Sequence, residues 1–213
     1  PGVEHTVSRA IRERFHGNAP AGTREIAAVD FADKSRAHGG HVRTLAQIVK
    51  SFEGPLVEFH GKSGLECIED VSAFVEEIKT KNAPGGVGGA CEPDLLIVGG
   101  HGVDGYLADA REIGRWRLSE VAASLARQLP RVRVIVFAVC GTNADAAVAG
   151  ELAKIKGPLI LGVTGKVEDA ECQNIVQTLV QKASTAPREH IKPELKAYAT
   201  TLDRRRRTLV CFN

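Results

Sequence analysis

Two reactive side chains, an imidazole and a thiol, each follow an apolar segment of the chain. Residues 95–98 lead into a glycine-rich segment around His101, and residues 132–139 end on Cys140. Both apolar runs are short, rich in β-branched residues and nearly free of charge, which is typical of central strands in a parallel sheet. Ligands of open α/β sheets bind at the carboxyl ends of such strands. His101 and Cys140 are therefore a candidate catalytic pair.

The chemistry of such a pair is nucleophilic catalysis. A cysteine becomes a useful nucleophile when a base or a positive potential raises its thiolate fraction. His101 could be the general acid/base, because imidazole titrates near neutral pH. The backbone N–H groups of Gly102 and Cys140 are candidates for an oxyanion hole, worth about 3–4 kcal/mol per donor. We also expect a helix after Cys140, whose N-terminal dipole would favour the thiolate.

Each of these residues also has an ordinary structural explanation. A cysteine at the end of an apolar strand is usually a small buried hydrophobic residue, and a histidine after glycines is usually a loop residue. Gly100, Gly102 and Gly105 also satisfy the spacing of the dinucleotide-binding fingerprint, so a nucleotide-binding α/β domain is an alternative. That motif should open an amphipathic helix, and residues 106–117 lack helical periodicity. The two strand-end residues together favour the catalytic interpretation.

Strands alternate with helices along the chain, which predicts a parallel sheet with right-handed crossovers and one α/β domain over residues 1–213. Strands are predicted at 24–31, 55–60, 95–98, 132–139 and 159–164, with a last edge strand near 208–212. Helices are predicted at 7–15, 41–52, 67–78, 119–129, 143–155 and 168–183. Residues 105–108 and 115–118 should form a hairpin, and Ser119 should cap the following helix.

The remaining segments are expected to be peripheral. Residues 1–24 are interpreted as a lead-in, 80–93 as a flexible glycine-rich loop, 187–196 as irregular and 203–213 as a basic tail. The chain contains no methionine and begins with Pro1, which indicates a fragment of a longer parent chain. Targeting signals and regulatory domains could therefore have been lost.

The bulk composition narrows the class of protein. Hydrophobic residues make up 43% of the chain, charged residues 25%, and the net charge is +2, which is ordinary for a globular protein and favours no acidic partner. No apolar run approaches the roughly 20 residues needed to span a bilayer, and no signal-peptide pattern opens the chain. Five widely spaced cysteines without a CxxC argue against a disulfide framework and a zinc site. We therefore expect a reducing, cytoplasmic compartment, no membrane association and no metal.

The order apolar strand, His101-Gly102, apolar strand, Cys140 resembles the caspase-like (clan CD) cysteine peptidases. The closest likeness is to CHAT domains (caspase HetF-associated with TPRs), and it continues in Ala149-Gly150-Glu151-Leu152 and in residues 165–171. It covers roughly residues 93–184. The resemblance implies a caspase-like three-layer sandwich, with a mostly parallel central sheet and helices on both faces. It also implies a cysteine endopeptidase that cleaves protein or peptide substrates, or itself.

The chain departs from the family pattern just before the cysteine. CHAT domains usually have Ser-Ala-Cys where this chain has Ala138-Val139-Cys140. Metacaspases place an aspartate at the position of Ala138 to hold a basic P1 residue. Because this chain lacks that aspartate, one argument for a preference for Arg or Lys at P1 is missing. The resemblance implies a substrate pocket between the cysteine strand and its neighbours. Thr164 and Asp169 are the candidate lining residues.

A basic run near the end of the chain suggests a second ligand. A related branch, the self-cleaving cysteine peptidase domain of large bacterial toxins, is activated by inositol hexakisphosphate. That likeness makes Arg204, Arg205, Arg206 and Arg207 a candidate polyanion-binding cluster, and the chain a candidate toxin or effector fragment. The alternative is a solvated basic run. No aromatic residues interleave it, so nucleic acid is not expected as a partner. The rival function from another class is a caspase-fold regulatory or scaffold domain without turnover.

Overall fold

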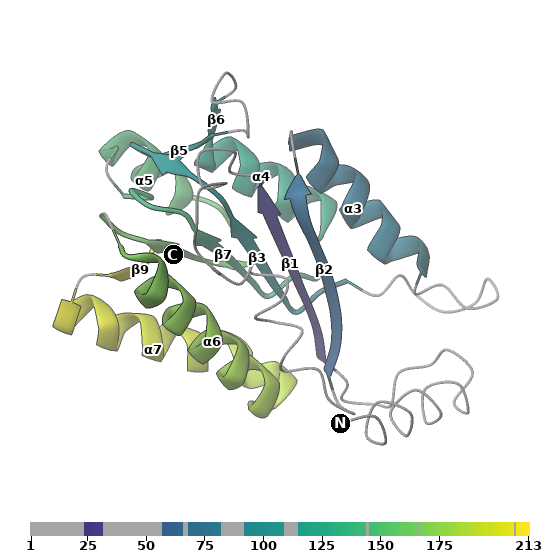
Figure 1. Ribbon diagram of the computed structural model, residues 1–213. Coiled ribbons are helices and arrows are strands. Elements are labelled where there is room, and N and C mark those ends of the chain that lie inside the picture. The colour runs from purple at the N-terminus through teal and green to yellow at the C-terminus, as the bar shows by residue number, and fades with distance from the viewer. Residues whose placement is uncertain are drawn as a thin grey trace.

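A mostly parallel six-stranded sheet crosses the middle of the computed structural model (Figure 1), in the order β2-β1-β3-β7-β8-β9. The structure describes residues 24–31, 57–65, 68–81, 92–108, 115–143, 145–165, 167–206 and 208–213. The strands are β1 (Arg24–Phe31), β2 (Val57–Leu65), β3 (Leu95–Gly99), β7 (Val134–Ala138), β8 (Leu159–Val163) and β9 (Leu209–Cys211). Neighbouring strands are parallel except β8 and β9, which are antiparallel. The predicted α/β class and parallel sheet are confirmed.

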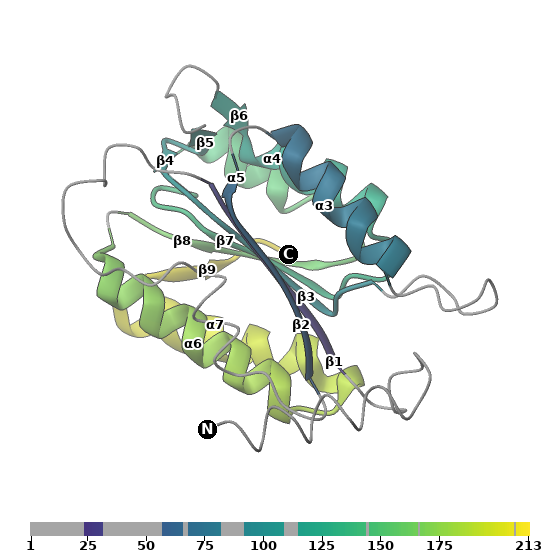
Figure 2. The same ribbon diagram turned by 45° about the vertical axis from the view of Figure 1, so that its right-hand side comes forward.

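Helices cover both faces of this sheet. Figures 1 and 2 show α3 (Ile68–Lys81), α4 (Leu118–Gln128) and α5 (Ala146–Leu152) on one face. The other face carries α6 (Asp169–Thr185) and α7 (Ile191–Arg206), joined through the short 3₁₀ helix η2 (Arg188–His190). Within the described ranges, none of the helices is long and apolar enough to cross a membrane.

The two helical layers explain why β3 and β7 are almost free of charge. Successive strand side chains point to opposite faces of a sheet, so each face needs its own apolar set. Leu95, Ile97, Val134 and Val136 share a buried cluster with apolar residues of α6 and α7. Leu96, Val98, Ile135 and Phe137 share the second cluster with α3, α4 and α5. Every residue of β3 and β7 is buried.

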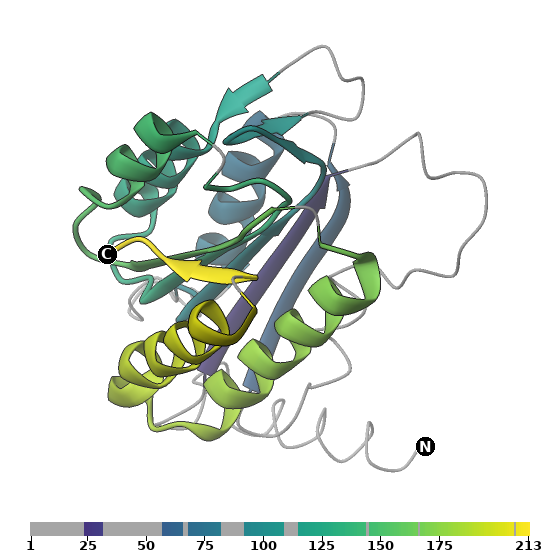
Figure 3. The ribbon, with the colours of Figure 1, turned by 90° about the vertical axis from the view of Figure 1, so that its left-hand side faces the viewer.

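A small antiparallel sheet, β4-β5-β6, follows β3 (Figure 3). Its strands are β4 (Gly102–Val103), β5 (Tyr106–Ala108) and β6 (Arg115–Arg117). The predicted hairpin corresponds to the antiparallel pair β5–β6. The strand β4 was not predicted. It is joined to β5 by Asp104 and Gly105, both at positive φ (49° and 83°), as a type I′ hairpin turn requires.

Two predictions at the starts of helices are wrong. Residues 187–196, predicted as irregular, form η2 and the first turns of α7. Ile191 and Leu195 are fully buried at helical spacing, and Pro193 lies in the first turn, where a missing N–H breaks no helical hydrogen bond. Ser119 does not cap α4, because the helix already begins at Leu118. Its hydroxyl instead donates to a carboxylate oxygen of Glu151 on α5, at 2.5 Å.

The expected loop and tail also need correction. The helix α3 extends to Lys81, and Glu92 is buried, with its carboxylate accepting from the backbone N–H of Arg131 at 2.6 Å. Residues 203–206 complete α7, and the predicted edge strand is β9. Residues 82–91, the segment 1–23 and the predicted helices at 7–15 and 41–52 lie outside the described residues.

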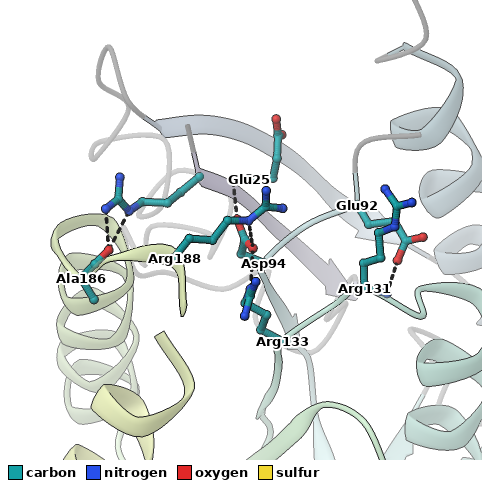
Figure 4. A network of polar contacts seen from close by, with 8 residues as sticks. Glu25, Glu92, Asp94, Arg131, Arg133, Ala186 and Arg188 are labelled. Atoms are coloured by element: carbon teal, nitrogen blue, oxygen red, sulfur yellow. Dashed lines mark hydrogen bonds and ion pairs between the residues drawn. The ribbon is translucent and has the colours of Figure 1, made fainter. Parts of the chain in front are cut away.

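A buried carboxylate organises the amino edge of the sheet (Figure 4). Asp94, immediately before β3, is 1% exposed. One of its oxygens accepts from Nε of Arg133 at 3.2 Å and from Nε of Arg188 at 2.7 Å. The other accepts from the backbone N–H of Glu25 at 3.3 Å. One side chain thus joins β1, β3, the segment that enters β7 and the connection between α6 and α7.

Replacing Asp94 by alanine should lower the free energy of unfolding by about 2–3 kcal/mol. This is below the 3–5 kcal/mol typical of a broken buried ion pair, because Arg133 and Arg188 keep some solvent. Urea denaturation followed by circular dichroism measures it. The control is Asp203→Ala at an exposed position of α7, which should change stability by no more than about 0.5 kcal/mol. Equal effects of the two variants would contradict the organising role of Asp94.

Candidate active site

His101 and Cys140 are positioned by two neighbouring strands of the central sheet. The parallel pairing of β3 with β7 ends with Gly99 opposite Ala138. His101 and Cys140 each follow the end of their strand by two positions. The two segments that carry His101 and Cys140 therefore leave the sheet side by side at its carboxyl edge.

The backbone of Gly102 lies directly against Cys140. A Cβ atom on Gly102 would lie 2.2 Å from Cγ1 of Val139, 2.3 Å from the carbonyl oxygen of Cys140 and 3.1 Å from its nitrogen. Only glycine fits at this distance. The residue after His101 and the residue that carries the thiol are therefore held in backbone contact, and the two predicted oxyanion donors belong to adjacent segments.

Hydrogen bonds on both sides hold the turn that follows Cys140. The N–H of Gly105 in the β4–β5 turn donates to the carbonyl of Gly141 at 3.0 Å. The N–H of Gly141 donates in turn to the carbonyl of Gly165, beyond β8, also at 3.0 Å. Gly141 has a φ of 70°, which favours glycine. This turn is thus fastened to the His101 hairpin on one side and to the end of β8 on the other.

Thr142 also holds the turn that follows Cys140. It is fully buried, and its single hydroxyl proton is shared between the carbonyl of Val139, at 2.9 Å, and the carbonyl of Val163. Its methyl group packs on Gly162, where a Cβ atom would lie 2.6 Å from Cγ2 of Thr142. Thr142 therefore limits the movement of the segment that carries Cys140.

The two reactive side chains differ in exposure. The imidazole of His101 is exposed, whereas Cys140 is half-buried. The Sγ atom of Cys140 lies 3.8 Å from the carbonyl oxygen of Val167, a weak thiol contact. The contacts of the described residues include no hydrogen bond between imidazole and thiol. Proton transfer between them would need a side-chain rotation or a bound substrate, as is common for unliganded active sites.

The helix expected to support a thiolate begins too late. It was predicted at 143–155, and α5 spans only Ala146–Leu152. Asp145 caps it, accepting from the N–H groups of Ala147 at 2.8 Å and Val148 at 3.3 Å. These first N–H groups are therefore satisfied by a carboxylate, and the helix end gives no support to a thiolate at Cys140.

The two candidate substrate-binding residues follow β8, the strand that neighbours β7. Thr164 follows β8, but its side chain is buried, and its N–H donates to the carbonyl of Thr208 at 3.1 Å. The exposed residue at this point is Gly165, with a φ of 65°. Asp169 is the first residue of α6. A ligand would therefore find the backbone around Gly165 more accessible than the side chain of Thr164.

Two further candidate sites can be placed in the fold. Arg204, Arg205 and Arg206 form the last turn of α7, and Arg207 lies outside the described residues. The segment that contains Gly100, Gly102 and Gly105 leads into the β4–β5 hairpin. The dinucleotide fingerprint requires a helix at this point, since the helix N-terminus binds the pyrophosphate. The nucleotide-binding alternative therefore lacks its supporting element.

Sequence reasoning missed three parts of the site. Asp104-Gly105 is the strongest short hairpin signal and could have located β4. The positions of Thr142 and Val167 beside the cysteine segment had no signal in the sequence, because they depend on the packing of β8 and its following loop against β7. All of these residues contact or support the segments that carry His101 and Cys140.

No family model matches the chain, and no curated protein is significantly similar to it. In the part of the chain that the structure describes, no group of three or more His, Cys, Asp or Glu side chains could hold a metal ion.

Replacing Gly102 by alanine should lower the free energy of unfolding by about 1–3 kcal/mol, because the added methyl group forces Val139 and the Cys140 carbonyl to move. Urea denaturation measures the loss. The matched control is Gly150→Ala in α5, where nothing lies within 4 Å of the new methyl group. That substitution should raise stability by about 0.5–1 kcal/mol. A neutral Gly102→Ala variant would show that the close backbone contact is not essential.

Proposed function

We propose that this chain is a caspase-like cysteine endopeptidase related to CHAT domains, with Cys140 as nucleophile and His101 as general acid/base. The observation that carries the proposal is the parallel pairing of β3 with β7, which sets both residues at one sheet edge. The contact of Gly102 with Cys140 also supports it, because the contact holds the backbone segments that carry His101 and Cys140 close together. Protein or peptide chains, including this chain itself, are the proposed substrates.

In the proposed reaction the Cys140 thiolate attacks the carbonyl carbon of the scissile peptide bond. The N–H groups of Gly102 and Cys140 stabilise the oxyanion that forms. His101 gives a proton to the leaving amine as the C–N bond breaks, which leaves a thioester on Cys140. Water then attacks the thioester, His101 accepts a proton from it, and the thiol and the new carboxylate are released. We place this thiol chemistry in a reducing compartment such as the cytoplasm.

A binding domain without turnover is the second candidate function. It is favoured by one observation, the contact of the Cys140 thiol with the Val167 carbonyl, at 3.8 Å. A cysteine turned toward a carbonyl is not activated by that contact, since a carbonyl cannot stabilise a thiolate. In this case the caspase-like fold would serve regulation or scaffolding.

The Cys140→Ala variant should lose all peptide cleavage, because the proposed thioester forms on the Cys140 thiol. Cleavage is measured as new peptide N-termini by mass spectrometry, with the chain itself and a mixture of unfolded proteins as substrates. Cys172→Ala is the control, since Cys172 is also a half-buried cysteine outside any disulfide but lies on α6. It should retain wild-type activity. Cleavage that survives in Cys140→Ala would disprove the assignment.

The His101→Ala variant should slow cleavage by about 10²–10⁴-fold, the usual contribution of a general acid/base. An electrophilic peptide probe that reacts with thiols separates the enzyme from the binding domain. Labelling of Cys140 in preference to Cys172 and Cys211, and its loss in His101→Ala, would support the enzyme. Equal labelling of the three cysteines, both with and without inositol hexakisphosphate, would support a domain without turnover.

A further inference from the structure

A hollow of about 400 Å³ opens at the amino edge of the central sheet. Residues 130–133 before β7, Gly157 before β8, Arg188 between α6 and α7, and Lys192 in the first turn of α7 line it. Its volume is within the range of small-molecule sites, roughly 300–1,000 Å³. Because the strands are parallel, the hollow lies at the opposite edge of the sheet from His101 and Cys140. We call it the amino-edge hollow.

The wall of this hollow carries a concentration of positive charge. Arg131, Arg133, Arg188 and Lys192 all line it, and none of the described residues that line it is acidic. Two carboxylates next to the hollow hold this wall in place: Asp94 accepts from Arg133 and Arg188, and Glu92 accepts from the backbone N–H of Arg131 (Figure 4). Both carboxylates are buried and neither lines the hollow.

Part of this positive surface is oriented in advance. The Nε groups of Arg133 and Arg188 both donate to the same oxygen of buried Asp94, which fixes the direction of each guanidinium group. The ammonium group of Lys192 donates to the carbonyl of Gly157, and two further N–H groups of the ammonium remain. Arg131 is exposed on the rim. A ligand would therefore lose less conformational entropy here than among freely moving lysines.

We propose that the amino-edge hollow binds the phosphate group of a small phosphorylated molecule. A phosphate monoester carries about −1.5 to −2 charge at neutral pH, which complements a wall lined by four basic side chains. Guanidinium groups bind phosphate through paired hydrogen bonds, and lysine adds a point charge. Gly157, with a φ of 106° and nothing within 4 Å of its missing Cβ, leaves that side of the hollow open for the rest of the ligand. This site is separate from the candidate active site.

Isothermal titration calorimetry with inorganic phosphate and inorganic pyrophosphate tests the proposal. The full chain should bind pyrophosphate at one site, more weakly as the salt concentration rises. The double variant Arg131→Gln/Lys192→Gln should bind it at least about tenfold more weakly, the loss expected when charge-assisted hydrogen bonds are removed. The control Lys62→Gln/Arg115→Gln removes the same charge at exposed positions of β2 and β6. Its affinity should stay within about twofold of the wild type.

Thermal unfolding distinguishes a loss of pyrophosphate binding from a loss of folding in the variants. Pyrophosphate should raise the unfolding temperature of the wild type and of the control, and not that of Arg131→Gln/Lys192→Gln. The single variant Arg131→Gln, at an exposed position, serves if the double variant is unstable. Absence of pyrophosphate binding by the wild type, or equal loss in the two double variants, would overturn the proposal. So would equally tight binding of citrate, or preferential binding of a short single-stranded oligonucleotide that depends on Arg131 and Lys192.

Discussion

The parallel pairing of β3 with β7 sets the positions of the residues in the candidate active site. Both strands are buried on both faces, so a shift of one residue would place every side chain in the wrong helical layer. Core packing therefore determines the register strongly. The register in turn sets where the segments that carry His101 and Cys140 leave the sheet. Beyond the last strand pair, the close approach of Gly102 to the Cys140 carbonyl keeps the two segments next to each other. The geometry of the edge is a consequence of core packing.

The two edges of the sheet are stabilised in different ways. At the carboxyl edge, turns rich in glycine and Thr142 hold backbone against backbone, which leaves His101 exposed and Cys140 half-buried. At the amino edge, the buried Asp94 holds two arginines and an N–H group of β1. A buried carboxylate without such partners would be costly. Chemistry at the carboxyl edge and anion binding at the amino edge could thus coexist in one sheet without sharing residues.

Much of the fold could be predicted from local patterns, and the errors have identifiable causes. The strands β1, β3 and β8 were predicted within a residue or two, because apolar runs bounded by glycine or polar residues are strong signals. The helix α7 was not predicted, although Pro193 lies in its first turn, where proline is tolerated. Ser119 was assigned as a cap because its type is a common cap, but its hydroxyl binds Glu151 on another helix. That partner is remote in sequence and could not be read locally.

The sequence by itself determined which residues can do chemistry and which strands carry them. His101 and Cys140 stand out because each follows an apolar run, and the alternation of strands and helices makes a parallel sheet the expected frame. Only the tertiary structure decided that β3 and β7 are neighbours and that Gly102 touches Cys140. It also decided that the Asp145 carboxylate caps the first turn of α5. It also gathered Arg131, Arg133, Arg188 and Lys192 around one hollow. The physical reason is that these relations join segments far apart in the chain, and burial of both faces of the sheet is what brings them together.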